Sequence, residues 1–279
     1  MINEISNNKI ALLIDAENVS EKYIKYILDE LSNYGLPTYK RIYGDWSSDA
    51  MRRWKNSLMT YSITPIQQYS YTTGKNSSDS ALIIDAMDIL YTGNVQGFCI
   101  VSSDSDFTRL ATRLREAGKM VIGMGERKTP KSLITACEKF IYLEVLVPEE
   151  DKRKKPESKP TKAKPVKEKV KTELPKAETA DSVFETPTTA HDNHVGEDIY
   201  EIVSAIKTII TEISNDDGLA SMADIGNALS RRFPEFDSRN YGFQKFSLFM
   251  SSLNGFEIIK QRPEGHPGIV HMYVKIKNN

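Results

Sequence analysis

Short apolar runs alternate with amphipathic segments along the first half of the chain. Residues 9–15 form an apolar run that ends in the carboxylate of Asp15, a pattern typical of a buried parallel strand. The run at 97–103 is almost free of polar side chains over its first five residues and predicts a second buried strand. Similar patterns predict further strands or extended segments at residues 37–45, 63–70 and 119–125.

Helical spacing of apolar residues fills the gaps between these strands. In residues 20–34, Tyr23, Ile27 and Leu31 share one helical face, and Gly35 ends the segment. The alternation of strands and helices predicts an α/β fold, with a parallel sheet flanked by helices on both faces. The first domain therefore extends over residues 8–147, and its other predicted helices are residues 48–61, 78–90, 106–118 and 132–140.

The pattern disappears at residues 148–194. This segment is rich in Lys, Pro and Glu and poor in aliphatic residues, so burial cannot offset the entropy of ordering it. We expect a disordered linker. Its basic stretch could hold nucleic acid loosely, or it could serve as a solvated tether.

A second periodic region covers residues 195–277. Three helical patterns, at 198–213, 221–233 and 238–253, precede two alternating runs that flank a turn. Three helices followed by a two-stranded ribbon is the order of a winged helix. We therefore predict a small α+β winged-helix domain, with its two strands at 256–262 and 269–276.

Composition limits the environment and the partners of the protein. The formal net charge of the 279 residues is −1, so the chain as a whole is not a basic nucleic-acid binder and any such attraction must come from local patches. The polar N-terminus lacks the apolar core of a signal peptide, and no apolar run approaches the roughly 20 residues that span a bilayer. Cys99 and Cys137 lack metal-ligand spacing. We expect a cytoplasmic protein without a membrane partner.

Four aspartates form the main candidate for chemistry. Asp15 ends the first strand, and Asp104 and Asp106 follow the strand at 97–103. If these strands are neighbours where the strand order reverses, their carboxylates converge at one rim of the sheet. Asp79 begins a helix on the face that turns toward the sheet. Clustered carboxylates repel one another unless a cation lies among them, and oxygen ligands favour Mg²⁺ or Mn²⁺.

Each of these aspartates alone also fits a structural role. An aspartate after a strand is often a turn or N-cap residue, and Asp104 or Asp106 could cap the following helix. Asp85 lies on the same helix as Asp79 and is a candidate supporting residue. All four histidines follow residue 190, which disfavours histidine-based chemistry in the first domain.

Several segments of the first domain resemble the NYN domain, a branch of the PIN-like nuclease superfamily, in its LabA-like form. They are LLIDAEN, KNSSDSALIIDAMDIL, the run from GFCIV to VIGMG, and SLITACEKFIYLE. The resemblance implies a PIN-like fold and divalent-metal hydrolysis of RNA, with Asn76 after Lys75 as a departure in a loop. It implies catalytic and metal-binding roles for Asp15, Asp79, Asp104 and Asp106, and supporting roles for Asn18, Ser102 and Ser103.

The C-terminal region, about residues 195–277, resembles the OST-HTH or LOTUS domain through DSRNYGFQKFSLFMSSL and the following FEII. The resemblance implies a winged helix that binds RNA. Basic and aromatic residues in both domains could hold phosphate and stack on bases, or could be solvated charges and core rings. The candidate RNA contacts are Arg52, Arg53, Lys75, Arg231, Arg232, Arg239, Tyr241 and Lys245.

The leading hypothesis is a metal-dependent ribonuclease whose C-terminal module recruits RNA. One alternative is a catalytically silent RNA-binding regulator, and another is a winged-helix DNA-binding regulator with an α/β sensor domain. Because metal-assisted hydrolysis needs no 2′-hydroxyl, DNA is not excluded as a substrate. The sequence leaves open whether the chain forms a homo-oligomer.

Overall fold

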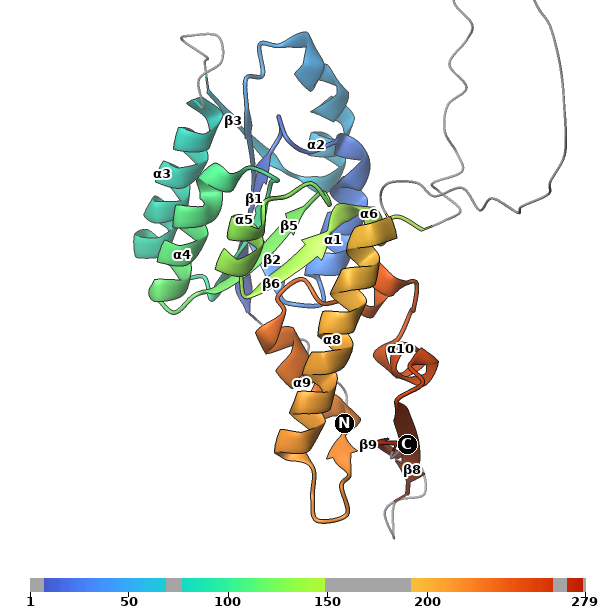
Figure 1. Ribbon diagram of the computed structural model, residues 1–279. Coiled ribbons are helices and arrows are strands. Elements are labelled where there is room, and N and C mark those ends of the chain that lie inside the picture. The colour runs from blue at the N-terminus through green and yellow to red at the C-terminus, as the bar shows by residue number, and fades with distance from the viewer. Residues whose placement is uncertain (1–7, 69–76, 149–191, 263–269, 278–279) are drawn as a thin grey trace, which may run out of the picture.

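The computed structural model describes residues 8–68, 77–148, 192–262 and 270–277. Figure 1 shows two folded parts, an α/β domain from the N-terminal half and a smaller domain from the C-terminal quarter. The predicted linker at 148–194 lies almost wholly outside the described residues.

A six-stranded parallel sheet forms the centre of the first domain, as predicted, with the strand order β3-β2-β1-β4-β5-β6. The chain builds outward from β1 in one direction and then returns to its other side with β4. The strand order therefore reverses between these two neighbours. The strands are β1 Lys9–Asp15, β2 Leu36–Gly44, β3 Thr64–Gln67, β4 Gly97–Val101, β5 Met120–Gly125 and β6 Lys139–Tyr142.

Helices cover both faces of this sheet because successive side chains of β1 alternate between two cores. Ile10, Leu12 and Ile14 pack on one face, whereas Ala11 and Leu13 pack on the other. The first face carries η1 Glu21–Tyr23, α1 Ile24–Leu31, η2 Asp49–Trp54, α2 Lys55–Tyr61 and α6 Leu143–Leu146. The second carries α3 Ser77–Thr92, η3 Ser105–Phe107, α4 Thr108–Glu116 and α5 Lys131–Ala136 (Figure 1).

The edge strand β6 corrects the prediction of one helix over residues 132–140. The apolar positions of this segment fit a helical period, but α5 ends at Ala136 and the chain then pairs with β5. Phe140 is fully buried there, and its ring lies over Gly123, where a Cβ would come within 2.5 Å of the ring. Strand pairing and this close approach outweigh the local helical pattern.

The C-terminal domain has the predicted winged-helix order. Its sheet is antiparallel with the strand order β7-β9-β8, and Ile206, Leu229, Phe249 and Val274 are fully buried in its core. None of the described helices has the length and hydropathy needed to cross a bilayer. The elements are α8 Asp192–Ile213, β7 Ala220–Ser221, α9 Met222–Arg232, η4 Ser238–Tyr241, α10 Phe246–Ser252, β8 Phe256–Gln261 and β9 His271–Ile276.

The third predicted helix, residues 238–253, is broken into two. The short helix η4 ends at Tyr241 and is capped by Gly242, whose φ of 85° lies in the left-handed region, and α10 begins only at Phe246. Glycine adopts that conformation without the steric cost that a side chain imposes. Strand β7 was also not predicted, because two residues are too short for a periodic pattern.

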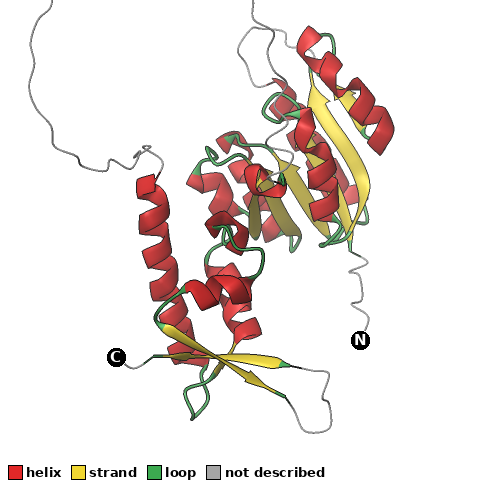
Figure 2. Cartoon of the chain, turned by 90° about the vertical axis from the view of Figure 1, so that its right-hand side faces the viewer, coloured by secondary structure: helices red, strands yellow, loops and turns green. Residues whose placement is uncertain are grey.

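The two domains are in direct contact along the edge of the large sheet (Figures 1 and 2). The backbone N–H of Phe140 in β6 donates to the carbonyl of Pro234 at 2.9 Å. The Lys139 ammonium donates to the carbonyl of Phe236 at 2.8 Å, and burial lowers the pKa of Lys139. The C-terminal domain therefore satisfies a donor of an edge strand that would otherwise be unpaired.

An arginine between two carboxylates reinforces this contact. The Arg239 guanidinium donates to both oxygens of Glu30 on α1, at 2.9 and 3.1 Å, and to Asp237 of its own domain at 2.6 Å. The side chains of Glu30 and Asp237 are only 10% and 14% exposed. These hydrogen bonds, first with Asp237 and then with Glu30, raise the pKa of Arg239. The pairing is bidentate, which fixes orientation as well as position.

Candidate functional site

The strand reversal between β1 and β4 places the first candidate residue next to the third motif. Asp15 is the last residue of β1, and Ser102 follows directly after β4, which pairs with β1 in parallel. Both side chains are 1% exposed. Side chains at the carboxyl ends of two adjacent parallel strands meet at the reversal point, as the sequence predicted for this fold.

The carboxylate of Asp15 is held by four hydrogen bonds. Asn18 donates its side-chain amide at 2.7 Å, and Ser102 donates its hydroxyl at 2.8 Å. The backbone N–H groups of Glu17 and Asn18 complete the set at 3.0 and 3.3 Å. Asn18 and Ser102 thus contact Asp15 directly, which is the geometry of supporting residues.

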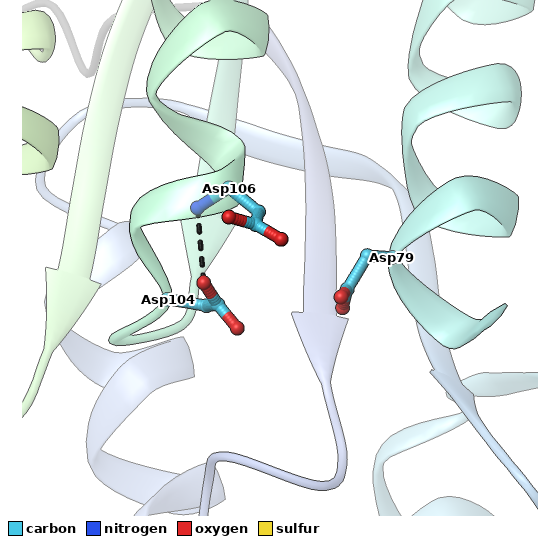
Figure 3. Close-up of side chains that lie close together, drawn as sticks. All are labelled: Asp79, Asp104 and Asp106. Atoms are coloured by element: carbon cyan, nitrogen blue, oxygen red, sulfur yellow. Dashed lines mark hydrogen bonds between the residues drawn. The ribbon is translucent and has the colours of Figure 1, made fainter. Parts of the chain in front are cut away.

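Asp79, Asp104 and Asp106 form an acidic cluster in front of these strand ends (Figure 3). One carboxylate oxygen from each lies within 4.8 Å of the other two. Asp79 comes from the first turn of α3, and the other two flank the start of η3. Asp104 also accepts a hydrogen bond from the backbone N–H of Asp106 at 2.9 Å, so it is the N-cap of η3 as well. Capping and clustering are compatible roles for this residue.

Asp15 does not belong to this set of three carboxylates. Its position was the easiest to infer from the strand pattern, whereas Asp79 depended on a helical face. In the structure Asp79 belongs to the cluster of three, and the oxygens of Asp15 accept hydrogen bonds from Asn18 and Ser102. The negative charge of Asp15 is nevertheless close enough to act on Asp79.

The cluster has the electrostatics of a cation site. Burial of Asp79, followed by the charges of Asp15, Asp104 and Asp106, raises its pKa to about 6. Asp79 is 7% exposed, so solvent screens this repulsion poorly. The donor set contains only carboxylate oxygens, which suit a hard divalent cation such as Mg²⁺ or Mn²⁺. A cation there would relieve the repulsion among the carboxylates, so the residues present fit such an ion.

Ser103 and Asp85 lie outside the acidic cluster. The Ser103 hydroxyl accepts a hydrogen bond from the backbone N–H of Glu126 at 2.8 Å, so it connects the ends of β4 and β5. Asp85 pairs with Arg41 and Tyr43 on β2. Tyr43 is the parallel-register partner of Asp15, so Asp85 supports the strand beside the site rather than the carboxylates themselves.

The candidate RNA contacts of the first domain lie on or near η2. Arg52 is 84% exposed and pairs with Asp49 at 3.0 Å, while Arg53 pairs with Glu21 at 3.3 Å. Trp54, which follows them, is fully buried and belongs to the core, so its ring cannot stack on a base. Lys75 lies outside the described residues.

The candidates of the C-terminal domain fall into two groups. Arg239 and Tyr241 lie at the domain contact, where Arg239 is bound by two carboxylates and Tyr241 packs against Phe249 with ring centroids 5.1 Å apart. Arg239 is therefore an interface residue, and Tyr241 packs against the core of its own domain. Arg231, Arg232 and Lys245 are exposed, and Arg232 is paired with Glu212.

Three basic residues in the loop from the end of β5 to the start of α5 were not among the predicted site residues. Arg127, Lys128 and Lys131 follow the strand end at Gly125, and this loop is bound to Ser103 beside the acidic cluster. The signal available in the sequence was the basic run ERKTPK directly after a predicted strand, at the same rim as the aspartates.

Comparison with family models assigns both domains. Residues 9–144 match the NYN domain, and residues 197–267 match the OST-HTH/LOTUS domain. The chain carries a NYN domain followed by an OST-HTH/LOTUS domain. NYN domains are PIN-like nuclease domains and OST-HTH/LOTUS domains bind RNA, so the architecture is that of a nuclease with an RNA-binding module.

Solved structures and curated proteins add little to this assignment. The crystal structure of a protein of unknown function from Vibrio parahaemolyticus is 20% identical, with a TM-score of 0.41. The match covers 51% of this chain and 96% of that one. None of the curated proteins matches the chain.

Proposed function

We propose that the protein is a divalent-metal-dependent ribonuclease whose NYN domain hydrolyses RNA phosphodiester bonds. The observation that carries this proposal is the cluster of Asp79, Asp104 and Asp106 within 4.8 Å at the strand reversal of a NYN domain. Three carboxylates from two separate segments converge there at a cost in mutual repulsion, which a purely structural role does not explain.

In this proposal Asp79, Asp104 and Asp106 hold Mg²⁺ or Mn²⁺. A bound ion of this kind lowers the pKa of a water molecule and neutralises charge on a phosphate. Asp104 is oriented by the N–H of Asp106, and the Ser102 hydroxyl accepts the N–H of Asp104 at 3.1 Å. Asp15 contributes a fixed negative charge behind the cluster, held in place by Asn18 and Ser102.

The OST-HTH/LOTUS domain supplies RNA to this site. Arg231 and Lys245 remain exposed on it, and either could contact phosphate. Because the domain is hydrogen-bonded to β6 and α1, it offers the RNA from a fixed direction relative to the NYN domain. A flexible tether without these contacts would instead let the module move freely around the NYN domain.

The test is cleavage of a labelled single-stranded RNA by the full chain with Mn²⁺ or Mg²⁺ and with EDTA. We expect cleavage with metal, none with EDTA, and a loss of at least ~100-fold for Asp104→Asn, because metal ligands matter more than the residues that orient them. Asp88→Asn is the matched control, since Asp88 lies exposed on the same helix as Asp79.

Cleavage that survives both EDTA and Asp104→Asn would exclude the metal mechanism. Absence of cleavage across varied RNAs, with RNA binding intact, would identify the protein as a catalytically silent RNA-binding regulator. Equal cleavage of single-stranded DNA would widen the substrate class without changing the role of the carboxylates.

A further inference from the structure

A cavity of about 220 Å³ lies between the two domains. Its lining comes from the loop after β5, from α5 and from β6 on the NYN side, and from α8 and the segment after α9 on the other side. The volume is below the ~300–1,000 Å³ typical of sites for larger ligands, so it suits one small flat group. Neither domain forms this cavity without the other.

The NYN side of the cavity is cationic. Arg127 and Lys131 line it, and both are exposed side chains for which the described residues provide no ion pair. The Arg127 guanidinium lies over the ring of Tyr142, 5.5 Å from its centroid, which fixes its direction. Two unpaired cations at the mouth of a cavity are the usual arrangement for an anion such as phosphate.

The opposite side is rich in hydrogen-bond acceptors. Glu201, Glu235 and Asn240 line it. One oxygen each of Glu235 and Asn240 is buried and has no hydrogen-bond partner among the described residues. A buried acceptor left unpaired is unfavourable, so a ligand with N–H donors gains affinity at this end.

Three aromatic rings also line the cavity, Tyr142 from the NYN domain and Phe233 and Tyr241 from the C-terminal domain. A nucleotide has the matching chemistry, since it joins an anionic phosphate to a flat base that carries N–H donors. We propose that this interdomain cavity binds one nucleotide of single-stranded RNA, with its phosphate at Arg127 and Lys131 and its base toward Glu235 and Asn240.

A short chain of contacts connects the lining of the cavity to the acidic cluster. Arg127 follows Glu126, whose backbone N–H donates to Ser103, and Ser103 precedes Asp104. A nucleotide in the cavity would therefore be held on the flank of the proposed cleavage site. This inference rests on the proposed function for its purpose, but binding to the cavity can be measured without any cleavage.

The test is binding of A-only and U-only RNAs of ~8 nucleotides to the full chain in EDTA. We expect Arg127→Ala and Lys131→Ala each to weaken binding of the A-only RNA by ~3- to 10-fold and to reduce its salt slope by about 0.7. Lys128→Ala is the matched control, because Lys128 lies on the same loop but pairs with Glu126 at 2.8 Å and does not line the cavity.

A second readout locates the RNA. Photo-crosslinking with 4-thiouridine should label the peptide that contains Tyr142 or Tyr241, and Glu235→Gln should weaken binding of the A-only RNA, whose bases carry an amino donor. If Lys128→Ala weakens binding as much as Arg127→Ala, or if crosslinks fall only on β8, β9 and α10, the cavity is not the site. Those results would leave the ribonuclease proposal standing. Absence of metal-dependent cleavage, with binding as expected, would leave the proposed nucleotide site standing.

Discussion

The Ser102 hydroxyl donates a hydrogen bond to the Asp15 carboxylate at 2.8 Å, across 87 positions of the sequence. The same hydroxyl accepts the backbone N–H of Asp104 at 3.1 Å. One buried serine therefore connects the end of β1 to the loop that carries two members of the acidic cluster. The proposed metal site depends on this connection as well as on its carboxylates.

Replacement of Ser102 tests that dependence. Ser102→Ala removes a donor from Asp15 and an acceptor from Asp104, so both carboxylates lose part of their fixed orientation. We expect Mn²⁺ affinity and RNA cleavage to fall by ~10- to 100-fold. Calorimetric titration with Mn²⁺ and a cleavage assay measure the two effects. Ser251→Ala, at an exposed serine that bonds only within α10, should change neither.

Repulsion within the cluster predicts that Asp79→Asn stabilises the metal-free protein. The folded pKa of Asp79, about 6, lies above its ordinary value, so the metal-free fold loses stability as pH rises from about 4 through 6. Asn removes this loss, which is about 3 kcal/mol near neutral pH.

Thermal unfolding in EDTA at pH 5 and pH 7.5 measures this difference. The variant should exceed the wild type by more at pH 7.5 than at pH 5, and Asp88→Asn should behave as the wild type at both. With Mn²⁺ the order should reverse, because the variant loses a proposed ligand. A variant less stable than the wild type in EDTA at pH 7.5 would contradict the repulsion.

Removal of Glu30 should release the C-terminal domain from the NYN domain. Glu30→Ala leaves Arg239 with only Asp237, and loss of one partner of a largely buried, hydrogen-bonded charge pair costs about 2 kcal/mol or more. Small-angle X-ray scattering should show a larger radius of gyration. Asp29→Ala, at the exposed neighbour on α1, is the control. An unchanged radius for Glu30→Ala would show that the β6 contact suffices.

Two glycines of the C-terminal domain should respond to alanine with opposite signs. Gly242 has a φ of 85° and open space at its Cβ position, so Gly242→Ala introduces backbone strain of about 1 kcal/mol without a clash. Gly226 lies within α9, where an added Cβ makes only ordinary contacts with Phe246, so alanine should stabilise that helix by up to ~1 kcal/mol. Urea unfolding of each variant measures the change.

Local patterns in the sequence were enough to predict most elements of both domains and the approximate place of the acidic residues. Local periodicity is a property of each segment, so the apolar run of β1 and the helical face of Asp79 could be recognised without neighbours. The edge strand β6 could not, because its residues become a strand only through pairing with β5 and the contact of Phe140 with Gly123.

Which carboxylates lie close together, and which groups each basic residue contacts, could be learned only from the tertiary structure. Asp15 and Asp104 both lie at strand ends, but they are connected only because β1 and β4 are neighbours and the Ser102 hydroxyl contacts both residues. Arg239 had the sequence context of a phosphate contact, yet it binds Glu30, 209 positions earlier. Such pairings depend on distances between remote segments, and no local pattern encodes them.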